Sequence, residues 1–307
     1  MATHEIPLER RTLHGHFSCE LEPILTADSG DSIVFSCLNA GWRGQDGERF
    51  AGRRPDGDEL DAGHALIGPV EVRGARADQV LEVRIDEVRI GPWGVTDAGG
   101  WHTPLNERLG VDDGEPAVLT WKLDADAGTG RDQEGRKVAL GPFLGVIGMP
   151  PSETGVHSTG PPRPCGGNID CKELVAGTTL FLPIPVDGAL VSAGDGHAAQ
   201  GDGEVSQLAI EAPVERARLT LVVRDDLVLA NPIAWTPEAW LTFGFDEDLD
   251  EAAAQAIDGM LELMAREHGL ERREALALAS IVVDLRVTQM VNGARGVHAR
   301  LAHDALR

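Results

Sequence analysis

The stretch "VLEVRIDEVRI", residues 80–90, decides the fold class of this 307-residue chain, because its apolar and polar side chains alternate. Leu81, Val83 and Ile85 share one face of an extended segment, which is the pattern of a strand with one buried face. Three more runs alternate in this way: "DSIVFSCL" (31–38), "AVLTWKLDAD" (117–126) and "RARLTLVVRDDLVL" (216–229). Glycine and proline clusters separate the runs, so the sequence predicts a mainly β body of the sandwich or barrel kind.

Helical spacing replaces this alternation after residue 240. Apolar side chains recur three and four positions apart before Gly269, which predicts an amphipathic helix through Leu249, Ala253, Ile257, Met260 and Met264. A second helix is expected in "ERREALALASIVVDLRVTQMV" (271–291), with an apolar stripe through Leu278, Val282 and Leu285. The predicted class is therefore α+β overall, a β-rich body with a C-terminal helical hairpin.

The chain is expected to work as one functional unit. Residues 1–240 would form a β-rich catalytic body, and residues 241–307 a helical segment packed on it. Residues 41–63, "GWRGQDGERFAGRRPDGDELDAG", are rich in glycine and charge and show no periodicity. We expect them to form a long excursion or flap on the body.

Composition excludes several classes of partner. The net charge of −23 would repel phosphate backbones and anionic lipid, which argues against nucleic-acid and membrane partners. No apolar run reaches about 18 residues, and the first residues lack the layout of a secretory signal, so a cytoplasmic location is expected. The four cysteines form no CxxC pair and are expected to be reduced thiols.

Two pairs of polar residues in a glycine-rich region point to a metal site. In "GALVSAGDGHAAQGDGEV" (188–205), Asp195 and His197 are two positions apart, so on an extended segment their side chains share one face. Asn168 and Asp170 have the same spacing in "GGNIDC" (166–171). Imidazole and carboxylate groups suit zinc or a similar divalent ion, and Glu204 would be a fourth ligand or the general base. Acidic turns that merely cap strands remain an alternative explanation.

Other chemistries fit the sequence less well. "GDGHAA" matches a loose dinucleotide-binding pattern, but no helix is expected after it. "VHSTG" (156–160) has valine where a nucleophile elbow has its first glycine. An EF-hand beginning at Asp195 would place Ala199 at a ligand position, so that pattern fails as well.

At these residues the chain closely resembles the acetamidase/formamidase family. "GVHSTGPPRPCGGNIDCKEL" (155–174) and "LFLPIPVDGALVSAGDGHAAQGDGEVSQLAIE" (180–211) match the family's His-Ser, GGN-x-D and GD-x-HA-x-QGD-x-E motifs. The likeness extends to "LHGHFSCELEPILTADSGDSIVF" (13–35), to "GHALIGPVEVRGARADQVLEVRI" (63–85) and to the last two predicted helices. It covers most of the chain.

The resemblance implies a metal-dependent amidohydrolase that cleaves the carbon–nitrogen bond of a small linear amide, giving a carboxylic acid and ammonia. Asp170, Asp195 and His197 are then expected to bind the metal, with zinc first and calcium or manganese as alternatives. Glu204, Asp195 and His157 are expected to be catalytic, and His64, Asn168 and Gln200 to bind substrate. A homodimer or higher homo-oligomer is also implied.

Three alternatives stay open at this stage. The substrate would be a cyclic amide or a guanidino compound, or the chain would be a non-catalytic β module that binds a divalent ion. Substrate choice is the least determined property, because "ARADQVLEV" lacks the glycine that the family commonly has before Asp78, and because the 41–63 excursion carries unusual arginine and aspartate content.

Overall fold

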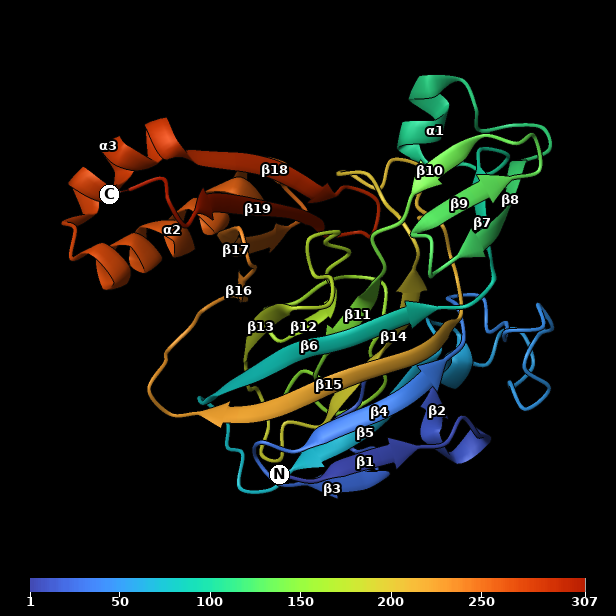
Figure 1. Ribbon diagram of the computed structural model, residues 1–307, viewed down its shortest axis with the longest axis horizontal. Helices are drawn as coiled ribbons and strands as arrows, with labels where there is room; N and C mark the ends of the chain where they lie inside the picture. Colours follow the sequence, from blue (N-terminus) through green and yellow to red (C-terminus); the bar gives the residue numbers. More distant parts are fainter. Residues whose placement is uncertain (307) are drawn as a thin grey trace.

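A nine-stranded sheet is the largest element of the protein, seen here in a computed structural model that describes residues 1–306 (Figure 1). From edge to edge its strands are β1 (Thr3–Ile6), β4 (Ser32–Cys37), β15 (Val214–Arg224), β6 (Val80–Ile90), β13 (Thr178–Pro183), β16 (Ile233–Trp235), β17 (Ala239–Asp246), β19 (Arg295–Ala302) and β18 (Val283–Gln289). Short 3-10 turns at Arg10–Thr12 and Glu59–Asp61 lie outside the sheets.

Two smaller sheets complete the β structure. A six-stranded sheet contains β12 (Gly166–Asn168), β11 (Phe143–Gly148), β14 (Val191–His197), β5 (Leu66–Val72), β2 (Leu13–His14) and β3 (Leu25–Ala27). A four-stranded sheet contains β10 (Lys137–Ala139), β9 (Thr129–Asp132), β8 (Ala117–Asp124) and β7 (Trp93–Ala98). One hydrophobic core joins side chains of the nine-stranded and six-stranded sheets, so these two sheets pack face to face. The predicted β-rich body is confirmed.

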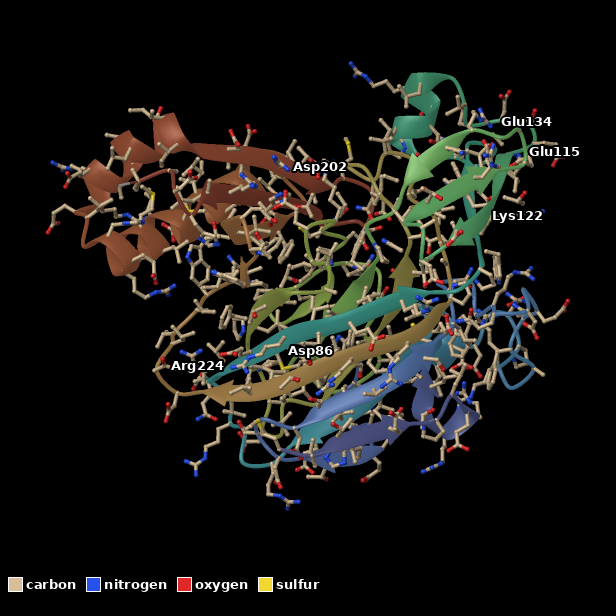
Figure 2. The ribbon with its side chains drawn as sticks, viewed as in Figure 1. Asp86, Glu115, Lys122, Glu134, Asp202 and Arg224 are labelled. Carbon is tan, nitrogen blue, oxygen red and sulfur yellow. The ribbon has the colours of Figure 1, made fainter. Side chains whose placement is uncertain are left out.

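Strands β6 and β15 show why the alternating sequence forms this sheet. They pair antiparallel, with Leu221 opposite Val83 and Leu219 opposite Ile85, and these side chains are buried in the core. The other face carries charge, for example Arg224, whose guanidinium lies 2.6 Å from the carboxylate of Glu82. Figure 2 labels Arg224 on β15 and Asp86 on β6. Each strand therefore has one apolar face and one charged face, as its sequence predicts.

The helices α2 (Leu249–His268) and α3 (Arg272–Val282) form the predicted C-terminal pair. The Asp248 carboxylate accepts hydrogen bonds from two backbone N–H groups in the first turn of α2, and the helix ends at Gly269, which has a left-handed φ of 66°. Met260 and Met264 of α2 are buried against β17 and β19. Within residues 1–306, no helix is both long and apolar enough to cross a bilayer.

The second predicted helix was too long. It ends at Val282, and Leu285 lies not on a helical stripe but on β18, which pairs antiparallel with β19. The β-branched residues from Ile281 to Val283, followed by alternation, favour an extended chain. The described part of the C-terminal segment, residues 241–306, is therefore a helix pair inserted between strands of the main sheet. A short helix, α1 (Pro104–Leu109), was not predicted; its cap is the Thr103 hydroxyl.

The 41–63 excursion folds back on the body. Its Trp42 is 1% exposed and donates a hydrogen bond from Nε1 to the backbone oxygen of Gly63. The carboxylate of Asp61, which is also buried, accepts hydrogen bonds from both terminal nitrogens of Arg10, at 2.9 and 3.0 Å. These contacts fix both ends of the segment, while its opening as a flap remains a prediction.

Buried thiols are poor nucleophiles in this fold. Cys37, Cys165 and Cys171 are buried, and all four cysteines are free of disulfides. Burial raises the pKa of Cys37 to about 12 and that of Cys165 to about 11. Because the thiolate is the reactive form, neither group is suited to attack a substrate at neutral pH.

We expect acid to destabilise the fold, because His14 is buried as a neutral imidazole. Its Nδ1–H donates to the His16 carbonyl at 2.6 Å, so Nε2 is left to accept from the Ser192 hydroxyl at 3.0 Å. Burial lowers the pKa of His14 to about 4, below the ordinary 6.5. Between these values the unfolded chain binds a proton that the folded chain does not. We expect the free energy of unfolding to fall by about 1.4 kcal/mol per pH unit, roughly 3 kcal/mol in all.

Urea unfolding followed at pH 7.5 and pH 4.5 measures this loss. His14→Gln should be less stable at pH 7.5, yet should lose less stability between the two pH values than the unaltered protein. An equal loss in both proteins would assign the acid sensitivity to other groups.

Candidate metal centre and active site

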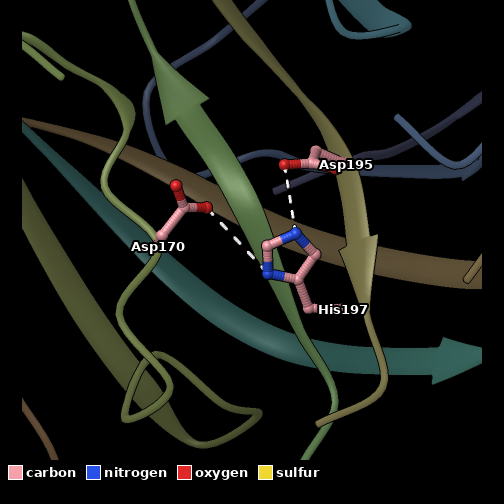
Figure 3. A group of neighbouring side chains, drawn as sticks. All are labelled: Asp170, Asp195 and His197. Atoms are coloured by element: carbon pink, nitrogen blue, oxygen red, sulfur yellow. Dashed lines mark ion pairs between the residues drawn. The ribbon is translucent and has the colours of Figure 1, made fainter. Parts of the chain in front are cut away.

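The structure brings Asp170, Asp195 and His197 into one buried cluster. One potential ligand atom of each lies within 4.8 Å of those of the other two. Asp195 Oδ2 is 3.3 Å from His197 Nε2, and Asp170 Oδ1 is 3.9 Å from His197 Nδ1 (Figure 3). All three side chains are at most 2% exposed.

Neighbouring strands of the six-stranded sheet position these side chains. Asp195 and His197 lie at the end of β14, and Asp170 follows β12, on the other side of β11. The backbones of Asp170 and Asp195 are both left-handed, with φ of 52° and 60°. Such conformations cost roughly 1–3 kcal/mol each and cluster at functional sites, where a side chain needs an unusual aim.

Gly145, on β11, leaves room at the middle of the cluster. A Cβ built there would lie 2.5 Å from Asp195 Oδ2, 2.6 Å from Asp170 Oδ1 and 2.9 Å from His197 Cε1. Real Cβ atoms do not approach other atoms so closely, so any side chain would displace the three groups. Glycine is therefore the residue that lets them face one another.

We expect Gly145→Ala to weaken metal binding by more than about tenfold, because each displaced carboxylate loses its aim at the shared ion. Titration against a coloured chelator measures the affinity. Gly141→Ala is the matched control, because a Cβ at Gly141 meets nothing within 4 Å. Similar metal affinities for the two variants would contradict a metal position beside Gly145.

Several buried oxygens around the cluster have no hydrogen-bond donor. They are Asp170 Oδ1, Asp195 Oδ1 and Glu211 Oε2. Buried carboxylate oxygens are costly unless they are hydrogen-bonded, paired with a cation or bound to a metal. Carboxylates bind zinc, manganese and calcium, and imidazole is a common ligand of zinc. The residues present therefore fit a divalent ion.

Glu211 belongs to this centre, and the sequence reading missed it. Its Oε1 is 3.3 Å from His197 Nε2, and with His197 and Glu204 it forms a second buried group that could hold a metal. The residue is only 4% exposed. A signal was available: "QLAIEAPV" (207–214) contains one carboxylate in an otherwise apolar run, and such a group needs a partner when it is buried.

Crowding of acids and imidazole shifts the pKa values in the centre. The pKa of Glu204 is raised to about 7, first by burial and then by repulsion from Glu211 and Asp195, against the attraction of His197. Burial and the Glu204 charge also raise the pKa of Asp170 well above its usual range. Asp195 goes the other way: its burial is outweighed by the charges of His197 and His64, so its pKa is lowered. Glu204 can thus exchange a proton near neutral pH.

The β18–β19 hairpin completes the centre from the C-terminal part of the chain. Asn292 in its turn donates from Nδ2 to Asp170 Oδ2 at 2.6 Å, and lies 3.5 Å from Glu204 Oε2. The same hairpin holds the loop of Glu204, because Gly203 N–H donates to the Thr288 carbonyl and its own oxygen accepts from Met290. Asn292 was not predicted, since no local motif marks a residue that arrives from so far along the chain.

Gln200, expected to bind substrate, has both polar ends occupied by the protein. Its Oε1 lies 2.9 Å from His197 Nδ1, and its Nε2 donates to the Asp170 carbonyl at 2.7 Å. The amide oxygen can only accept, so Nδ1 carries a hydrogen, and Nε2, which faces Asp195 and Glu211, is the ring nitrogen that can exchange its proton for a metal ion. The geometry favours a residue that orients the imidazole for a metal rather than one that contacts substrate.

The other predicted residues lie at different distances from the cluster. His64 Nε2 is 3.9 Å from Asp195 Oδ2, and its Nδ1 bonds the Thr159 hydroxyl at 2.8 Å. Asn168 is buried at the end of β12; its Nδ2 donates to the Gly160 carbonyl, and its Oδ1 has no partner. His157 Nε2 lies 2.9 Å from the Glu153 carbonyl and has no recorded contact with the cluster among the described residues.

A pocket of about 590 Å³ lies beside the centre and reaches it through His64. Its walls come from three parts of the chain that are distant in sequence: residues 15–16, the 41–63 excursion with His64, and residues 156–160. His157 faces this pocket too. His64 and His157, predicted as a substrate-binding and a catalytic residue, therefore share one cavity.

Comparison with known proteins identifies related chains. The sequence model of the Acetamidase/Formamidase family matches residues 153–299. An acetamidase from Bacillus halodurans is 30% identical in sequence, and its crystal structure superposes with a TM-score of 0.83 over 97% of each chain. A Schizosaccharomyces pombe protein provisionally named a formamidase is 27% identical over 78% of this chain and 74% of its own. The formamidase of Methylophilus methylotrophus is 26% identical over 63% of this chain and 60% of its own.

The β-rich fold, its buried acid–imidazole centre and these likenesses define the class of protein, an amidohydrolase of carbon–nitrogen bonds other than peptide bonds. The resemblance first read from the His-Ser, GGN-x-D and QGD-x-E motifs is confirmed. The chain belongs to the acetamidase/formamidase family.

Proposed function

We propose that this protein is a metal-dependent hydrolase that converts a small linear amide and water into a carboxylic acid and ammonia. The observation that carries the proposal is the buried cluster of Asp170, Asp195 and His197, with unpaired carboxylate oxygens, beside a pocket that is lined by His64. Asp170, Asp195 and His197 would bind the ion, and Glu211 is within reach of the same position.

A divalent ion at this centre would polarise the amide carbonyl and make a water molecule easier to deprotonate. Glu204 has a raised pKa of about 7, which suits a group that takes a proton from water and gives it to the departing nitrogen. Asn292 lies 3.5 Å from the Glu204 carboxylate and donates a hydrogen bond to Asp170 beside it. Gln200 fixes the ring of His197.

His64 is the best-placed donor for the substrate. The Thr159 hydroxyl accepts from the His64 backbone N–H and can donate to its Nδ1, which leaves the ring hydrogen on Nε2, toward Asp195 and the cluster. A hydrogen bond from Nε2 would support the oxyanion that forms at the attacked carbonyl. The Asn168 side-chain amide donates to the Gly160 carbonyl, and His157 Nε2 lies 2.9 Å from the Glu153 carbonyl.

An ammonia-release screen with formamide, acetamide, longer amides and lactams, run with and without added zinc, manganese or calcium, tests this function. Chelation should abolish turnover, and one of the three ions should restore it. Thermal melting recorded on the same samples separates a catalytic ion from a structural one. Stability that depends on metal, with no turnover of any amide, would identify a non-catalytic module.

We further propose a homodimer or higher homo-oligomer. Apolar residues of α3 and β18 are exposed on one part of the chain, with Leu276, Ile281 and Leu285 exposed to 52%, 80% and 48%. Strand β18 is also an edge of the nine-stranded sheet. Light scattering of the purified protein should give a mass above 32.7 kDa; that mass itself would mean a monomer.

A further inference from the structure

The pocket beside the centre is larger than formamide or acetamide requires. Its volume is about 590 Å³, whereas a water molecule occupies about 30 Å³ in the liquid, so an amide of a few heavy atoms needs on the order of 100 Å³. Most of the cavity is left for a part of the substrate beyond the reacting group. The chemistry of its walls indicates what that part is.

Two arginines of the 41–63 excursion, Arg49 and Arg53, line the pocket together with His64. Arg53 is well fixed: its guanidinium carbon lies 5.6 Å from the centre of the Trp42 ring, and its Nη2 donates to the Asp61 carbonyl at 3.0 Å. The side chain is 13% exposed. Its Nε, however, is buried and has no acceptor.

An N–H group buried without an acceptor is destabilising, and a ligand that supplies the acceptor recovers that free energy. The acid nearest to these arginines does not fill the role. Asp56 pairs with both Arg49 and Arg53, but it is 71% exposed and lies outside the pocket lining. Among the lining residues Glu59 is the one carboxylate, and it is exposed. The two guanidiniums thus make one wall of the pocket positive in a chain whose net charge is −23.

The positive wall and the candidate metal centre are joined by direct contacts. Arg53 stacks on Trp42, whose Nε1 donates to the Gly63 carbonyl at 2.9 Å. Gly63 precedes His64, which reaches Asp195. One molecule in the pocket can therefore face His64 at one end and the arginines at the other.

We propose that the substrate is an amide that carries a carboxylate several bonds from the reacting carbonyl, and that Arg53 and Arg49 bind this carboxylate. The proposal rests on the amide hydrolysis proposed above. A guanidinium matches the planar carboxylate with parallel N–H donors, which neutral or cationic amides cannot use. The carboxylate itself takes no part in the reaction, which still consumes one water and releases one ammonia.

Steady-state kinetics on amides of matched length test the proposal. The monoamides of succinic and glutaric acid are compared with butyramide and valeramide, and with 4-aminobutyramide as the cationic analogue. We expect the carboxylate-bearing amides to have kcat/KM values about 10- to 100-fold above those of the neutral amides, mostly through a lower KM. Equal values, or a preference for the neutral or cationic amides, would overturn the proposal.

Two variants locate the effect. Arg53→Gln should lower the ratio of kcat/KM for carboxylate-bearing over neutral amides by about tenfold or more. Arg49→Gln should lower it as well, and tests the proposal if Arg53→Gln fails to fold, because Arg49 is half exposed and pairs with Asp56 alone among the acids. Arg54→Gln removes the same charge from the same segment outside the pocket lining, and should leave the ratio unchanged.

The outcomes separate this proposal from the proposed function. Ammonia from neutral amides, with a ratio that no arginine variant changes, would leave the hydrolase in place and remove the carboxylate site. An equal fall of the ratio in Arg54→Gln would assign the effect to general charge and also remove that site. No ammonia from any amide would defeat both.

Discussion

His197→Ala is expected to abolish metal binding and ammonia release together. The substitution removes a proposed metal ligand and also the cation-forming group that lies 3.3 Å from both Asp195 and Glu211. Residues that merely support metal ligands typically contribute roughly 10- to 100-fold to affinity, so loss of a ligand should cost more than about a hundredfold. The buried acids left behind repel one another, so the variant should also melt at a lower temperature.

Metal content after dialysis, ammonia release and thermal melting are the three measurements for this variant. His303→Ala is the matched control, because His303 stacks on Trp235 and bonds the Thr236 carbonyl, outside the centre. It should keep both metal and activity. Bound metal and turnover that both survive in His197→Ala would defeat the proposed centre.

Glu204→Gln is expected to lower kcat by about 10²- to 10⁴-fold, because the amide keeps the shape of the side chain and cannot take a proton. Metal content should stay at the level of the unaltered protein, and the acidic limb that titration of Glu204 gives to the pH profile of kcat should be lost. Rapid-quench or coupled ammonia assays over pH 5–9 measure both effects.

Asp202→Asn is the control for Glu204→Gln. Asp202 lies on the same loop, but its carboxylate pairs with Lys172 at 3.0 Å and is part exposed. It should leave kcat nearly unchanged. Loss of metal from Glu204→Gln, in step with the loss of kcat, would contradict a base and make Glu204 the fourth ligand, since it also lies in a ligand group with His197 and Glu211.

Local pattern was sufficient for most of the β body. The alternation in residues 80–90 predicts the buried face of β6 because one face of each strand meets a single core. The same argument failed at Leu285, where helical and extended spacing overlap over a few residues and pairing with β19 decides between them. The intrinsic secondary-structure propensity of a residue carries no information about the strand with which it will pair.

In the candidate site, too, local sequence motifs predicted some residues, whereas others depend on long-range contacts. Asp170, Asp195 and His197 were found because short motifs carry them, and the structure places them in one cluster. Asn292 joins them through a contact 122 positions apart in sequence, which no spacing rule reports. Gly145 was missed for a different reason, because a glycine's role there depends on which three side chains surround it.

The arrival of Asn292 from the last hairpin has a consequence for biosynthesis. A ribosome must synthesise the chain past Ala302 before β18 and β19 can dock beside the Glu204 loop, so a shorter nascent chain would carry the acids of the centre without the support of Asn292. We therefore expect the proposed centre to bind its ion tightly only after this hairpin has docked. Shortened products that lack this hairpin should emerge as weakly metallated, inactive protein.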